Sequence, residues 1–117
     1  MNMTDWNNML DKTRAAITGY ELALDGLVDV SLLQAYVVVC QDLPLTFDVV
    51  EGQAFNPRTA PPQLATRFTL DAAAQVARRV RNGNGIQGEV VHVRHAIAAA
   101  LARQRELLAV LLEHSAE

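Results

Sequence analysis

The sequence predicts a small α+β domain with an N-terminal helical part, a two- or three-stranded sheet and two helices in the C-terminal half. Apolar residues recur at helical spacing near both ends, two valine-rich runs stand between them, and glycines and prolines separate these segments. The 117 residues fit a single domain, and the 50% of hydrophobic residues suffices for a core. The alternative is an all-α bundle in which residues 31–41 and 88–114 are helical throughout.

The first predicted element is a helix from about Asp5 to Thr18 that ends near Gly19. Thr4 is its expected N-cap, because a hydroxyl there can accept a hydrogen bond from the first turn, and Asp5 suits the helix dipole. One face of this helix carries four apolar residues and one threonine, namely Trp6, Met9, Leu10, Thr13 and Ile17.

Residues 20–41 permit two interpretations. Asp25-Gly26 is typical of a two-residue hairpin, but that turn would set apolar residues opposite polar ones, so a helix over residues 20–27 is preferred. Residues 31–34 match a capping box, whereas residues 36–39 form a β-branched run typical of a buried strand. We expect the strand.

The middle of the chain predicts one further strand and a loop. Pro44 is expected to interrupt regular structure, residues 46–50 to form a strand, and Glu51-Gly52 to turn the chain. The stretch 56–62 holds three of the four prolines and is expected to be a loop.

The clearest segment is a helix capped by Thr69, with Asp71 in its first turn. Its predicted buried stripe consists of Ala73, Val76, Ala77 and Val80. Asn82-Gly83 is expected to end it in a left-handed conformation. Residues 89–94 then suit a strand, because three of the six are valine, and a helix follows from about His95 to His114.

Residues 83–88 read G-x-G-x-x-G, the fingerprint of dinucleotide-binding folds. A dinucleotide site requires a strand before the glycines and a helix after them, so that the pyrophosphate meets the helix N-terminus. The predicted order here is helix, glycines, strand. We therefore expect a connecting loop and no cofactor.

Charge is distributed unevenly between the two halves of the chain. The net charge is −3, but residues 1–57 carry eight acids against two bases, and residues 58–117 carry eight arginines against five acids. Arg78, Arg79 and Arg81 gather at the end of the central helix, where they are a candidate patch for an anion or a partner. No aromatic residues alternate with them, so contact with nucleic acid is the alternative rather than the main expectation.

The remaining reactive residues predict no catalytic or metal site. Glu89, His92 and His95 would share a face only on a helix, and a di-iron site needs two such motifs. No serine stands in a nucleophile elbow. Because Cys40 is the single cysteine, no intrachain disulfide can form, which favours a reducing compartment. Cys40 lies in an apolar run, where a free thiol is expected to be buried.

The C-terminal helix is the strongest positive signal for function. Its last turns are apolar around most of their circumference, so one face can pack on the core while another needs a partner. This candidate interface consists of Leu107, Leu108, Val110, Leu111 and Leu112. The first helix is an equally good candidate to cover that face.

No signal peptide and no membrane span are expected. The first residues lack a positive charge and an apolar segment, and the longest apolar run, from Leu32 to Cys40, is broken by Gln34. The expected location is the cytoplasm.

Residues 65–97 resemble a module of small phage- or prophage-encoded proteins of unknown role. The residues that carry the likeness are the cap Arg67-Phe68-Thr69, the stripe Ala73, Val76-Ala77 and Val80, and the run Glu89-Val90-Val91-His92-Val93. In that module a hairpin precedes the capped helix and a strand closes it. The resemblance covers about a third of the chain and implies an accessory or virion-associated protein with protein partners, located in the host cytoplasm or the virion. It brings no catalytic residues.

The sequence thus predicts a non-enzymatic interaction protein that binds proteins and forms a homo-oligomer. A nucleic-acid-contacting accessory protein is the alternative, and a nucleotide-binding enzyme is the interpretation with least support.

Overall fold

A computed structural model describes residues 2–27 and 34–115. The capping box expected at residues 31–34 falls largely outside these ranges. The chain divides into two compact units. The helical unit comprises helix α1 and the part of helix α3 that starts at Ile97, and the sheet unit comprises four strands, helix α2 and the first residues of α3. The predicted α+β class is confirmed, and the sheet has four strands rather than two or three.

Helix α1 spans Met3–Gly26. Its N-cap is Asn2 and not the predicted Thr4, because the Asn2 side-chain oxygen accepts the backbone N–H of Asp5 at 2.8 Å. The predicted end near Gly19 is wrong. The space around Gly19 is open and its backbone is not left-handed, so this glycine costs the helix about 1 kcal/mol without ending it. The helical interpretation of residues 20–26 is thereby confirmed.

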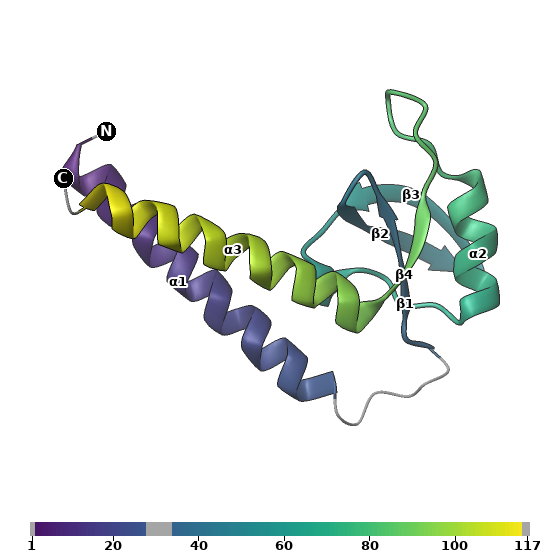
Figure 1. Ribbon diagram of the computed structural model, residues 1–117. Coiled ribbons are helices and arrows are strands. Elements are labelled where there is room, and N and C mark those ends of the chain that lie inside the picture. Colours follow the sequence, from purple (N-terminus) through teal and green to yellow (C-terminus); the bar gives the residue numbers. More distant parts are fainter. Residues whose placement is uncertain (1, 28–33, 116–117) are drawn as a thin grey trace. The chain divides into compact units, whose positions relative to one another are not determined.

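In the helical unit, α1 runs beside α3, which spans Val93–Ser115 (Figure 1). The indole N–H of Trp6 donates to the carbonyl oxygen of Leu111 at 3.2 Å, which places the start of α1 beside the end of α3. Residues that are buried or half-buried recur along both helices at alternating spacings of three and four, as in antiparallel coiled coils. In α1 these are Trp6, Leu10, Thr13, Ile17, Tyr20 and Leu24, and in α3 they are Ile97, Leu101, Gln104, Leu108 and Leu111.

The sheet unit is antiparallel throughout, with the strand order β3-β2-β1-β4. Strand β1 spans Tyr36–Cys40, β2 Leu43–Val50, β3 Gln53–Thr59 and β4 Glu89–His92. The strands predicted at residues 36–39 and 89–94 are confirmed, except that α3 already begins at Val93. The all-α alternative is therefore wrong.

Two-residue turns join the first three strands. Gln41 and Asp42 between β1 and β2, and Glu51 and Gly52 between β2 and β3, all have positive φ angles. Positive φ at both central residues is the geometry of type I′ turns, whose twist matches that of the flanking strands. The turn predicted at Glu51-Gly52 is confirmed.

Two predictions for the middle of the chain are wrong. Pro44 lies at the start of β2 instead of interrupting the chain, and residues 56–59 belong to β3 instead of a loop. Strand β3 tolerates Pro57 because it is an edge strand and because its register with β2 shifts between Thr46 and Asp48. Residues 62–64 form a short 3-10 helix.

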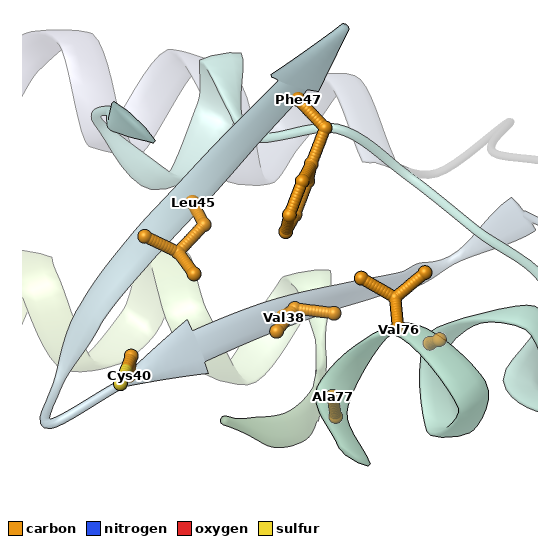
Figure 2. Packing of buried hydrophobic residues seen from close by; sticks show 7 residues of the cluster. Val38, Cys40, Leu45, Phe47, Val76 and Ala77 are labelled. Atoms are coloured by element: carbon orange, nitrogen blue, oxygen red, sulfur yellow. The ribbon is translucent and has the colours of Figure 1, made fainter. Parts of the chain in front are cut away.

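Helix α2 spans Leu70–Arg79 and packs on β1 and β4. The predicted cap is confirmed, because the Thr69 hydroxyl accepts the N–H of Ala72 at 3.2 Å. The predicted stripe is confirmed too: Ala73, Val76 and Ala77 are buried, and Val80 is half-buried. Figure 2 shows Val76 of α2 and Phe47 of β2 pointing toward one another, with Val38 of β1 beside them in the same buried cluster. None of the helices in the described ranges has both the length and the apolar character to cross a membrane.

Candidate functional site

The G-x-G-x-x-G sequence connects α2 to β4, so the predicted order of helix, glycines and strand is confirmed. The predicted left-handed stop at Asn82-Gly83 is wrong. Val80, which follows α2, is extended, Arg81 pairs with Gln87, and the left-handed glycine of the loop is Gly85. The element that follows these glycines is strand β4, and α3 begins only after it.

Asn82 organises this loop. Its side-chain oxygen accepts the backbone N–H groups of Asn84 and Ile86 at 2.8 and 3.0 Å, and its amide donates to Gln41 at 2.7 Å. The Cys40 thiol donates to the carbonyl oxygen of Ile86 at 3.2 Å. These bonds fasten the loop to the β1–β2 turn, so the Cys40 sulfur is engaged in structure.

The three arginines of the predicted patch have different surroundings. All three side chains are exposed, and Arg78 and Arg79 lie in the last turn of α2. Arg81 lies beyond the helix, and its guanidinium donates to the carbonyl oxygens of Arg78 and Val80, at 3.1 Å each. Arg81 therefore caps the carbonyl end of α2, where positive charge is favourable.

A cavity of about 200 Å³ opens between the end of α2 and the β2–β3 hairpin. Its lining residues are Phe47, Ala54, Phe55, Pro57, Val76, Arg79, Val80 and Arg81. Arg79 and Arg81 thus border a mainly apolar space, whereas Arg78 does not line it. The arginines can be recognised from the sequence, but the residues of the β2–β3 hairpin cannot, because nothing local in the sequence indicates which helix they oppose.

An ion pair lies on the exposed side of the same hairpin. Arg58 donates to Asp48 at 3.1 Å, and the Asn56 amide donates to the second carboxylate oxygen at 3.1 Å. The hydrogen bonds from Arg58 and Asn56 lower the pKa of Asp48 below its ordinary value, and the charge of Arg58 acts in the same direction.

His92 takes a structural position. His92 Nδ1 accepts the backbone N–H of Arg94 at 3.1 Å, which makes His92 the residue that caps α3. Its ring also contacts the rings of Tyr36 and His95 edge-on, with centroids 5.4 and 6.4 Å away. Among the residues described, no three histidine, cysteine, aspartate or glutamate side chains come together as metal ligands.

The predicted apolar interface of α3 divides into two parts. Leu111 is buried, and Leu107 and Leu108 are half-buried. Val110 and Leu112 remain 48% and 43% exposed. Two methionines of α1 near the Trp6–Leu111 contact, Met3 and Met9, are 73% and 37% exposed. We call Met3, Met9, Val110 and Leu112 the helix-pair tip.

Comparisons with known proteins add no relative: no family model matches the chain, and neither curated proteins nor solved structures give a match. The likeness of residues 65–97 to phage-encoded modules therefore stays a prediction.

Proposed function

We propose that this protein is a non-catalytic interaction protein that self-associates through the helix-pair tip. The observation that carries the proposal is that four exposed apolar side chains flank one contact between α1 and α3. Met3 and Met9 lie three residues before and after Trp6, and Val110 and Leu112 flank Leu111. Exposed apolar groups gathered at one place mark interaction surfaces, whereas single ones are ordinary.

The construction of the helical unit supports the same proposal. Two antiparallel helices bury one stripe each against the other, and their flanks remain open unless further helices pack there. A second copy supplies an identical pair, and the surface then pairs with itself around a two-fold axis, as in most homodimers. Methionines suit such a surface because their flexible side chains adapt to a partner.

Sedimentation equilibrium over a wide concentration range tests the proposal. Val110→Glu places a charge in the helix-pair tip and should weaken dimerisation at least about tenfold, or by roughly 1.4 kcal/mol. Leu22→Glu is the matched control, because Leu22 is 66% exposed near the other end of α1 and makes the same change of charge. Circular dichroism should show that both variants keep their helices.

A monomeric native chain at every concentration would refute the proposal, and so would equal weakening by the two variants. Contact with nucleic acid through Arg78, Arg79 and Arg81 has less support, since one of these arginines caps α2 and the other two differ in whether they line the cavity.

A further inference from the structure

The cavity beside α2 has the size and polarity of an anchor site for one side chain. Its volume of about 200 Å³ lies below the range of roughly 300–1,000 Å³ typical of small-molecule pockets. Interface anchors are commonly single aromatic or apolar side chains that fill such pockets. Phe47 and Val76 are buried lining residues, and Ala54 and Val80 are half-buried ones, so an apolar group would meet apolar surface.

The apolar surface continues past the cavity along the hairpin. Val49 is the register partner of Ala54 and is 50% exposed. Residues paired across antiparallel strands share a face of the sheet, so Val49 extends the surface that Ala54 begins. A bound segment thus meets further apolar surface beside an anchor.

The border of the cavity is positively charged and holds no acid. Arg79 and Arg81 are its only charged lining residues, and within the described part of the chain neither forms an ion pair. Arg81 is already oriented by two carbonyl oxygens, yet a guanidinium has five N–H donors and retains others for a ligand. Paired arginine donors match the two oxygens of a carboxylate.

We infer that this cavity binds a short acidic segment of a partner protein. The segment places an aromatic or branched apolar side chain against Phe47 and Val76, and a neighbouring carboxylate on Arg79 and Arg81. Charge complementarity selects an acidic segment. This site lies in the sheet unit and is independent of self-association through the helix-pair tip.

Titration of the ¹⁵N-labelled full chain with a capped peptide tests the inference. The probe is acetyl-Glu-Glu-Phe-Glu-Glu-amide, and amide shifts are followed in two-dimensional NMR spectra. Saturable shifts are expected at Ala54, Arg79 and Val80. Arg79→Gln should weaken the peptide about tenfold, because a charge-assisted hydrogen bond is lost.

Arg78→Gln is the matched control, since Arg78 is also exposed in the same turn but does not line the cavity. It should leave the affinity unchanged. A second probe, with serine in place of phenylalanine, should bind much more weakly.

Three kinds of outcome would overturn the inference. The first is the absence of saturable shifts. The second is equal weakening by Arg78→Gln and Arg79→Gln, or equal binding of the serine peptide, since either would mean diffuse charge attraction without the cavity. The third is tighter binding of single-stranded DNA with shifts at all three arginines, which would assign the patch to nucleic acid.

Discussion

Gly88 lies directly against the backbone of Ala77. A Cβ atom at Gly88 would come within 3.2 Å of the Ala77 carbonyl oxygen and 3.0 Å of a Val38 methyl carbon. Backbone cannot yield as a flexible side chain can, so this glycine permits the close approach of α2 to the sheet. The last glycine of the fingerprint therefore serves packing.

The three glycines of the loop should respond differently to alanine. Gly88→Ala should lower the free energy of unfolding by about 1–3 kcal/mol through overpacking. Gly85→Ala should lower it by about 1 kcal/mol, because Gly85 has a φ of 77°. Gly83→Ala meets open space and ordinary backbone, so it is the control and should leave stability unchanged or slightly raised. Urea denaturation measures all three, and equal losses would contradict these roles.

The β1–β2 turn offers a stabilising substitution. Asp42 has a φ of 65°, which glycine adopts without steric cost. Asp42→Gly should raise the free energy of unfolding by about 0.5–1 kcal/mol, since type I′ turns favour glycine at this position. Asp42→Ala retains the strained backbone and should give no gain. A thermal melt that ranks alanine above glycine would contradict this account.

Asp48 should titrate at an unusually low pH. Its lowered pKa in the folded chain means that its ion pair favours folding above the ordinary aspartate pKa. This contribution is lost as the pH falls through the lowered value, when the carboxylate takes up a proton. Carboxyl ¹³C NMR titration should show the Asp48 pKa rising in Arg58→Ala. An identical pKa in the variant and the native chain would refute the assignment.

His92 should act as a helix cap. His92→Ala removes the acceptor for the Arg94 N–H and should cost about 1 kcal/mol of stability. His92→Asn offers another acceptor at that position and should recover most of the loss, although it lacks the ring that contacts Tyr36. Comparing the unfolding midpoints of the two variants separates the cap from the ring contact. Equal losses would mean that the ring contact dominates.

The outcome for the two predicted helix caps differed, although both depend on neighbouring residues: the cap of α1 is Asn2 and not Thr4. The Thr69 cap needs only an N–H three residues away, and its prediction is confirmed. Strand β3 was missed because Asn56 and Pro57 are typical of loops. They are tolerated there only because the strand lies at an edge and carries a register shift.

The candidate site could be predicted only in part. Clustered arginines are visible in the sequence, but their different roles follow from where α2 ends, which is at Arg79 and not near Gly83. The cavity joins residues 47–57 to residues 76–81, and this pairing depends on the folded hairpin. Local patterns carry no information about such an apposition.

The single thiol gives the chain a natural reporter of local opening. Cys40 is 5% exposed, and its sulfur is held under the glycine loop by the Ile86 carbonyl oxygen. A thiol reagent can reach this sulfur only when the loop lifts from β1, so its reaction rate measures how often that happens. Labelling kinetics would thus report the local stability of the glycine loop without an introduced probe. They would also show whether a ligand bound beside α2 makes this opening less frequent.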